Sequence, residues 1–412
     1  MLTVTEPVRQ GRMLRLAFVA AVSSLVVCYA ASASPIPLFN TYRADDGFSN
    51  AGISLAVVTY SVGTVAALLV LGRLSNHLGR RPTGLATLGL VLLGCLLLLD
   101  VHQIAILLAG RLLMGLGVGL ASSSLTSYIV DSAPARPSWL ASVAASQSPM
   151  LGLSIGAIGS GALVRFGPLP RDLIYLVDIG LLLLCAVLIA VSPETATPTP
   201  GAWRSLPPRV HVPARSRHLL PVGTAIFVAT WATGAFYQAF VPALIADQLS
   251  SHSPLVLGLV FSAYMAPSVL GAPIGGRLSA AAAQRLGMII FLAGWIGILV
   301  ALTTGALPLF IGASIIGGVG QGIAISTAIR GLLHDSLLAD RAPIFAAVYM
   351  INYSGAVILV LAAGELSQVL SLSQITVGFG GIALIATMIT ALAARARHPG
   401  AMAEARRPTG GR

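Results

Sequence analysis

The sequence predicts an all-α integral membrane protein, with twelve transmembrane helices in two pseudo-symmetric six-helix bundles. The chain is 56% hydrophobic and only 9% charged, and its mean hydropathy of +0.90 is typical of a protein embedded in lipid. The phrase Gly-Arg-Leu-Ser occurs at 72–75 and again at 276–279, each time after a long apolar run. The second half therefore restarts the first, as in duplicated helical bundles that surround a central site.

Twelve apolar runs are long enough for membrane helices, because a spanning helix needs roughly 20 residues at about 1.5 Å each. In the first half they lie near 14–38, 52–71, 83–100, 104–129, 139–163 and 173–192. In the second half they lie near 219–245, 255–275, 286–304, 307–329, 343–364 and 373–394.

The first run has an alternative interpretation as a cleaved secretory signal. Arginines precede it, and Ala31-Ser32-Ala33 resembles a cleavage site. The run is longer than a usual signal core, and its removal would leave five helices against six. We therefore expect it to remain as a transmembrane helix.

Arginine sets the predicted orientation, because the chain contains no lysine. With a cytoplasmic N-terminus, 20 of the 24 arginines fall on the inside, whereas only Arg43, Arg165 and Arg171 lie in outer loops. This bias predicts that both termini are cytoplasmic. The alanine, glycine and arginine richness favours a GC-rich bacterial genome, and hence the bacterial inner (plasma) membrane. Topology also explains the net charge of +11, so no nucleic-acid partner is expected.

Polar segments divide the chain into predicted domains. An N-terminal bundle covers 1–192, a proline- and arginine-rich cytoplasmic linker 193–218, a C-terminal bundle 219–394, and a cytoplasmic tail 395–412. The tail has the composition of a disordered segment that touches anionic lipid. The three cysteines lie in separate predicted helices, so we expect no metal site, disulfide framework or cofactor. No catalytic constellation indicates an enzyme, and a chain without lysine cannot form an ATP-binding P-loop.

The loop after the second predicted helix reads Gly72-Arg-Leu-Ser-Asn-His-Leu-Gly-Arg-Arg-Pro82. It resembles the signature loop of the major facilitator superfamily, in which glycine, leucine, a small residue, aspartate, glycine and basic residues recur. The departure is Asn76, where that family usually has aspartate. The resemblance in layout covers almost the whole chain, and it implies a secondary transporter with a gating cluster on its cytoplasmic side. The expected members of that cluster are Gly72, Arg73, Asn76, Gly79, Arg80, Arg81 and Asp131, with Asp131 paired to Arg73 or Arg80.

Arg111 lies about seven residues inside the fourth predicted helix and precedes a glycine run that resembles another family motif. A charge at a helix centre costs roughly 2.5–3.5 kcal/mol on insertion scales, so Arg111 needs a partner or a wet cavity. The alternative is an arginine that snorkels to the outer headgroups. Asp178, the one acid well inside a run, is a candidate partner for Arg111 or a member of a proton relay.

The fifth predicted helix carries Gly152, Gly156 and Gly161, in a degraded form of a family pattern that marks antiporters. The alternative interpretation is close helix packing. For the substrate cavity, the resemblance points to polar and aromatic residues of several cavity-lining helices. The candidates are Tyr29, Gln147, Trp231, Tyr237, Gln238, Tyr264, Gln321, Asn352 and Tyr353. Each of them can equally be a packing residue.

Together these features predict export of a small organic solute or drug by alternating access, coupled to proton antiport. Aromatic and amide side chains suit a moderately lipophilic or cationic solute. Uptake of a small organic solute is the alternative within transport, and a non-transporting membrane sensor is the alternative outside it. The resemblance implies a monomer.

Overall fold

The computed structural model describes residues 5–134, 136–137, 140–207, 214–333 and 338–394. The predicted tail 395–412 and part of the predicted linker, 208–213, lie outside these residues. All regular elements in the described part are helical, and twelve segments there are long and apolar enough to cross a membrane. The predicted fold class is thereby confirmed. The domain boundaries stay a prediction.

The first six spans follow one another with short connections. They comprise α1 (Thr5–Ala33) with η1 (Ile36–Leu38) and α2 (Phe39–Asp45); α3 (Asn50–Ala66) with the π-helical η2 (Ala67–Leu71); α5 (Arg80–Leu98), α6 (Ile104–Ser132), α7 (Leu140–Phe166) and α8 (Leu173–Val191). The short helix α4 (Ser75–Leu78) lies in the loop before α5. Two short helices follow α8, namely η3 (Ala202–Ser205) and η4 (Ala214–Leu219).

The last six spans repeat this order. They comprise α9 (Leu220–Ala239) with α10 (Val241–Asp247); α11 (Pro254–Met265) with η5 (Ala266–Leu270) and α12 (Gly271–Gly275); α13 (Ala280–Thr304), α14 (Leu307–Leu333), α15 (Leu338–Leu366) and α16 (Leu372–Ala393). The predicted runs agree with these spans to within a few residues at most ends.

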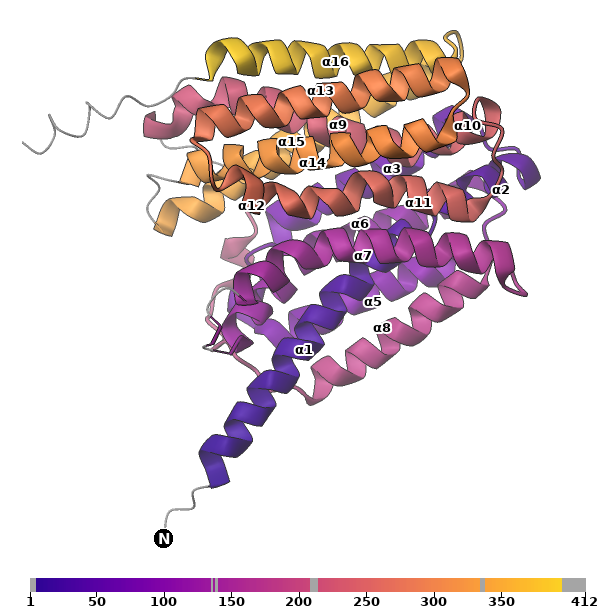
Figure 1. Cartoon of the computed structure of the whole chain (residues 1–412). Coiled ribbons are helices and arrows are strands. Elements are labelled where there is room, and N and C mark those ends of the chain that lie inside the picture. Colours follow the sequence, from indigo (N-terminus) through magenta and orange to yellow (C-terminus); the bar gives the residue numbers. More distant parts are fainter. Residues whose placement is uncertain (1–4, 135, 138–139, 208–213, 334–337, 395–412) are drawn as a thin grey trace, which may run out of the picture.

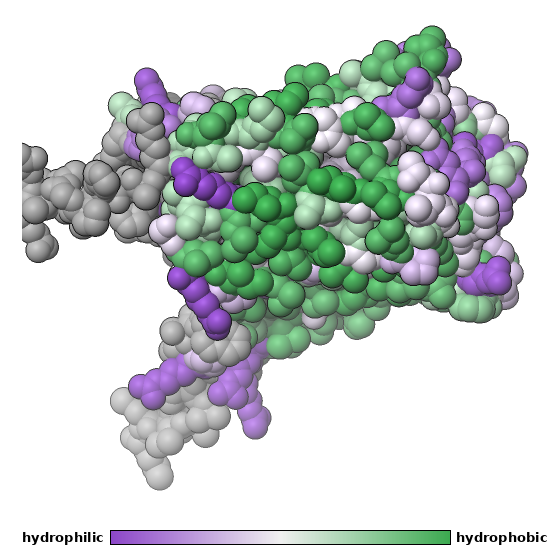
Figure 2. All heavy atoms as spheres, turned by 45° about the horizontal axis from the view of Figure 1, so that its top comes forward, coloured by the Kyte–Doolittle hydropathy of each residue, from purple (hydrophilic) through white to green (hydrophobic). Residues whose placement is uncertain are grey.

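The two bundles lie side by side and meet along two helix pairs. In Figure 1 α1, α5, α7 and α8 form the lower part and α13, α14 and α16 the upper part, with α7 and α11 adjacent between them. The second pair is α3 with α15. Figure 2 shows a broad hydrophobic band across the face in view, with hydrophilic residues gathered toward its two ends. We call the end that carries α4 and η3 the arginine-rich end, and the end that carries α2 and α10 the opposite end.

The first span runs past its predicted end at residue 38, and the first and seventh spans are both broken and then continue. Pro35 and Pro37 lack the N–H that a helix needs, so α1 ends at Ala33 and the chain resumes as η1 and α2. In the second half α9 ends before Pro242, and α10 continues to Asp247. Both breaks lie on the way to the opposite end, where they reorient the last turns of the span.

Candidate functional site

Arg111 lies where the two bundles meet and is completely buried. Its guanidinium donates to the Ser32 carbonyl oxygen at 2.7 Å and to the Ala56 carbonyl oxygen at 3.5 Å. It also donates to Oε1 of Gln238 on α9, at 3.2 Å, and lies 4.3 Å from the centroid of the Tyr60 ring. The snorkelling interpretation is therefore wrong. This cation is held by neutral groups, and one of them belongs to the other bundle.

Asp178 is also buried, with 3% of its surface exposed, on the face of α8 that packs against α1 and α5. Its Oδ2 has no hydrogen-bond partner. Ser34, at the break of the first span, lies beside it. None of the hydrogen bonds of Arg111 reaches Asp178, so the pair that we expected between these charges is not formed.

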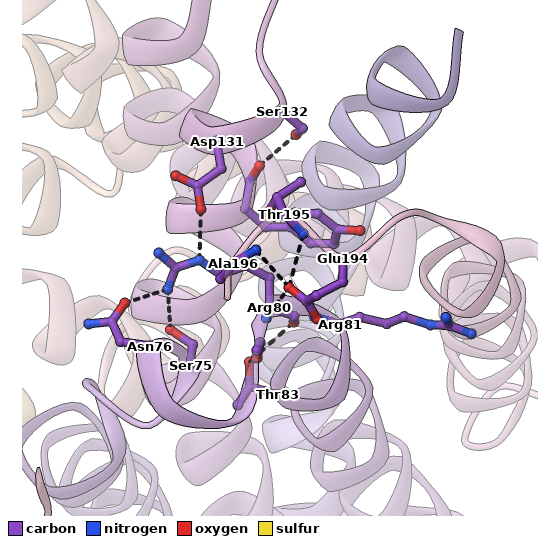
Figure 3. A network of polar contacts seen from close by, with 12 residues as sticks. Ser75, Asn76, Arg80, Arg81, Thr83, Asp131, Ser132, Glu194, Thr195 and Ala196 are labelled. Carbon is purple, nitrogen blue, oxygen red and sulfur yellow. Dashed lines mark hydrogen bonds and ion pairs between the residues drawn. The ribbon is translucent and has the colours of Figure 1, made fainter. Parts of the chain in front are cut away.

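Arg80 organises the signature loop at the arginine-rich end (Figure 3). Its Nε donates to Oδ2 of Asp131 at 2.8 Å, and its NH1 donates to Ser75 Oγ and Asn76 Oδ1, each at 2.7 Å. Of the two pairings considered for Asp131, the structure therefore contains the one with Arg80. Asn76 serves as an acceptor within the loop, because its amide oxygen can receive the guanidinium without a charge of its own.

Glu194, just after α8, closes the same network from another span. Its carboxylate accepts the backbone N–H groups of Arg80 and Arg81 at 2.8 and 3.0 Å, which are the first two residues of α5. It also accepts the N–H groups of Thr195 and Ala196. Burial raises the pKa of Glu194, but the four donors outweigh burial and hold it below its usual range. Glu194 thus caps a helix N-terminus, where a negative charge is favoured.

The segment after Glu194 is tied to the signature loop as well. Arg73 donates to the carbonyl oxygens of Ser205 and Pro207. Thr199 donates to the Asn76 carbonyl oxygen at 3.2 Å. The described first part of the predicted linker is therefore fastened to the first bundle. The predicted gating cluster did not include Glu194, because a capping contact between residues 114 positions apart leaves no local pattern.

Three of the predicted cavity residues pack inside the second bundle. Tyr237 and Tyr264 stack with ring centroids 4.4 Å apart, and both are almost fully buried. Their hydroxyls bond Ser314 Oγ at 2.6 Å and the Thr230 carbonyl oxygen at 3.1 Å. Gln321 donates to the carbonyl oxygen of Tyr264 at 3.4 Å. The packing alternative accounts for these contacts.

Other candidates lie nearer to the bundle interface. Trp231 on α9 meets Tyr353 on α15 edge to face, with centroids 5.5 Å apart. Tyr29 on α1 bonds Ser122 on α6, with 2.8 Å between their hydroxyl oxygens. These aromatic side chains come from both bundles and retain partly exposed surface at Tyr29 and Trp231.

The remaining two amides differ in environment. Asn352 on α15 is 2% exposed, and its Oδ1 has no hydrogen-bond partner. Gln147 on α7 is half-buried and donates to the neighbouring Ser146 hydroxyl at 3.2 Å. With Gln238 already bonded to Arg111, the nine cavity candidates do not form one cluster of side chains.

The glycines of α7 lie where other helices approach most closely. A Cβ at Gly152 or Gly156 would collide with α1, and one at Gly161 would collide with Pro254 at the start of α11. Close packing therefore accounts for the motif that resembled an antiporter pattern. Gly72 follows η2 and begins the turn into the signature loop.

Two contacts that the sequence analysis missed join the bundles at the opposite end. Asn40 on α2 donates to the Pro242 carbonyl oxygen at 2.8 Å, and Arg43 lies 3.7 Å from Asp247 on α10. The sequence did contain a signal for this ion pair, because Arg43 and Asp247 are 204 residues apart and so occupy equivalent positions of the two halves. We call these four residues the α2–α10 gate.

Known proteins resemble parts of this chain in sequence. The family profile described as Major Facilitator Superfamily matches residues 21–236, which is more than half of the chain. The probable glucose transporter rco-3 of Neurospora crassa is 29% identical over 160 residues, or 36% of this chain and 26% of that protein. Probable inositol transporter 2 of Arabidopsis thaliana is 32% identical over 128 residues, or 30% and 22%. The matched stretches thus span about a quarter of each relative.

Solved structures share the whole fold. One is a POT family transporter in complex with a thioalcohol conjugated peptide, with a TM-score of 0.74 at 13% identity, covering 92% of this chain and 96% of that one. Another is a POT family transporter in complex with 5-aminolevulinic acid, with a TM-score of 0.72 at 14% identity, covering 93% and 96%. At such identities the likeness concerns the fold alone. The family match and the twelve spans identify the chain as a member of the major facilitator superfamily, a multi-pass membrane transporter.

Proposed function

We propose that this protein is a secondary transporter that takes up a small polar organic solute by alternating access. The observation that carries the proposal is the bond from Arg111 to Gln238 across the bundle interface. A buried guanidinium without a carboxylate partner can exchange a neutral amide for an oxygen of a solute, because both are hydrogen-bond acceptors. Movement of one bundle against the other would then make and break this contact.

Uptake is preferred over the export that the sequence analysis favoured. The prediction of export depended on the glycine pattern of α7, and close helix packing accounts for that pattern. The partial relatives are named as probable transporters of glucose and of inositol, which supports a small polyhydroxylated solute. Cytoplasmic termini, a bacterial plasma membrane and a monomer remain part of the proposal.

The test compares solute accumulation in cells that express the protein, its Arg111→Gln variant, or an empty vector. The panel should hold radiolabelled hexoses, inositols, small carboxylic acids and lipophilic cations, each with and without a protonophore. We expect higher accumulation of one oxygen-rich solute in the cells with the original protein, and at least about a tenfold loss with Arg111→Gln, as removal of one charged hydrogen bond predicts.

Arg330→Gln is the matched control, because among the described residues this guanidinium bonds carbonyl oxygens of its own bundle and none of the other. Lower accumulation of a lipophilic cation in the expressing cells would instead establish export. No change for any solute, with folded protein shown in the membrane, would favour the sensor.

A further inference from the structure

Asp178 is the buried charged group that the proposed transport step leaves unused. Its side chain is 3% exposed within a membrane span, and its Oδ2 lacks a hydrogen-bond partner. Burial of an unpartnered polar atom is costly, and acids inside membrane spans are rare for that reason. Arg111, the other buried charged residue in the described part of the chain, donates hydrogen bonds to Ser32, Ala56 and Gln238. Asp178 therefore differs from it in having a vacant acceptor.

The surroundings of Asp178 suit a proton better than a metal ion. Ser34 lies beside it just after α1, and Cys95 on α5 and Tyr175 on its own helix are near enough to interact with its charge. The Tyr175 hydroxyl is bonded to that of Tyr42. In the described part of the chain it forms no ion pair, and no three metal-ligating side chains gather there. Hard cations take about six or more oxygen ligands, whereas one carboxyl oxygen is enough for a proton.

The position of Asp178 connects it to a hinge. Ser34 lies at the break between α1 and η1, where prolines remove two helical hydrogen bonds. The Ser34 hydroxyl donates to the Ala30 carbonyl oxygen at 3.1 Å, which helps to close the last turn of α1. Ser160 on α7 donates to the Ser34 carbonyl oxygen at 2.6 Å. The segment beyond this break is α2, which carries Asn40 and Arg43 of the α2–α10 gate.

We propose that Asp178 is the binding site of a coupling proton, and that it controls the α2–α10 gate through the Ser34 hinge. This inference rests on the proposed transport function and adds its coupling site. A proton that binds Oδ2 turns an acceptor-only carboxylate into a neutral carboxyl group. In its charged form Asp178 competes with the Ala30 carbonyl oxygen for the Ser34 hydroxyl. In its neutral form Asp178 does not compete, so the hydrogen bond from Ser34 to Ala30 stays in place. The structure, with the Ser34 to Ala30 bond formed and the gate closed, corresponds to the protonated form.

The experiment measures the gate directly and needs no transported solute. Nitroxide labels are attached to cysteines introduced at two exposed positions, Ala44 on α2 and Ser250 shortly after α10, once the native cysteines are replaced. Distances between the labels are recorded in lipid nanodiscs from about pH 5 to about pH 9, a range in which buried carboxyls of proteins titrate. We expect one short distance at low pH and growth of a longer one as the pH rises. In Asp178→Asn, which keeps the neutral form, the short distance should persist at every pH.

Two further variants separate the proposed role of Asp178 from other causes of a pH response. A control with His102→Gln and His252→Gln removes the described histidines at the opposite end and should retain the full pH response. Ser34→Ala should abolish the response even if Asp178→Asn does not fold. A response that survives in Asp178→Asn, that disappears with the histidines, or that is absent from the original protein would overturn the proposal. Such results would leave solute uptake in cells, and hence the transport function, untouched.

Discussion

The signature loop and its repeat 204 residues later occupy equivalent places but are held in different ways. In the first, Arg80 bonds Asp131, and Glu194 caps α5 from the end of another span. In the repeat, Arg330 donates to the carbonyl oxygens of Gly275 and Leu278 at 3.0 and 3.2 Å. Ser279 caps its own helix with an acceptor distance of 3.4 Å. Carboxylates hold the first loop, whereas backbone carbonyls and a hydroxyl hold the described part of the second.

The difference indicates a division of labour between the bundles, in which the first loop connects several helices and the repeat mainly stabilises its own turn. The first loop joins α5, α6 and the segment after α8, so its contacts form or break only when several elements move together. The repeat is more local in its described contacts, because Arg330 and Ser279 bond residues of α12, the start of α13 and the loop between them, although Arg285 reaches the end of α16. We therefore expect that removal of a charge disturbs the first loop more than the second.

The largest expected effect comes from Arg80→Gln. This change removes three hydrogen bonds, one of them to a carboxylate, and leaves Asp131 without its cation. A charged bond contributes about 1.5–3 kcal/mol, so we expect a loss of transport of about tenfold or more at equal amounts of protein in the membrane. The matched variant is Arg277→Gln, an exposed arginine of the repeat, which should change the initial rate little. Equal losses in both would contradict the division of labour.

The next effect concerns Gly79, whose φ of +101° belongs to a region that is nearly restricted to glycine. A Cβ there would also approach the Glu194 carboxylate to 2.6 Å. We expect Gly79→Ala to lower the free energy of unfolding by about 1–3 kcal/mol, measured by thermal unfolding in detergent. The equivalent residue of the repeat is Ala283, which lies inside the ordinary helix α13. Ala283→Gly should cost only about 0.5–1 kcal/mol, and a larger loss there would reverse the comparison.

A smaller effect with a pH dependence is expected for Glu194→Ala. Loss of an exposed cap costs about 0.5–1 kcal/mol, near the lower end for caps. Because the pKa of Glu194 is lowered in the folded state, its contribution is complete above the ordinary carboxyl pKa of about 4.3. The contribution disappears as the pH falls through the lowered value.

The measurement is the difference in melting temperature between the original protein and Glu194→Ala, taken near neutral pH and again under acid conditions. The difference should shrink on acidification. Ser279→Ala provides the control, since its neutral cap predicts a smaller difference that does not change with pH. A pH-independent loss in Glu194→Ala would show that the carboxylate charge plays no part in capping.

Much of the fold was predictable, because apolar run length and the repeated loop depend on local sequence. The charged contacts were predictable only in part. Asp131 lies next to Arg80 because the end of α6 and the start of α5 are on the same side of the membrane, which topology alone indicates. Arg111, by contrast, is bonded to carbonyl oxygens of Ser32 and Ala56, and every residue offers such an acceptor. Backbone partners, and the depth at which Tyr237 packs, depend on helix rotation and bundle closure rather than on residue type.

The smallest expected effect is at Arg81, and for this pair of equivalent residues the variant in the second half should be the more harmful one. Arg81 uses its backbone N–H to bond Glu194, while its side chain is exposed and extends away from the network in Figure 3. Its equivalent, Arg285, donates from its guanidinium to the Ala394 carbonyl oxygen and so fastens α13 to the end of α16. Arg81→Gln should thus lie within about 0.5 kcal/mol of the original protein, whereas Arg285→Gln should lose about 1 kcal/mol in the same unfolding assay. A larger loss of stability in Arg81→Gln than in Arg285→Gln would contradict this expectation. It would show that the charge of the side chain, and not its hydrogen bonds, stabilises each loop.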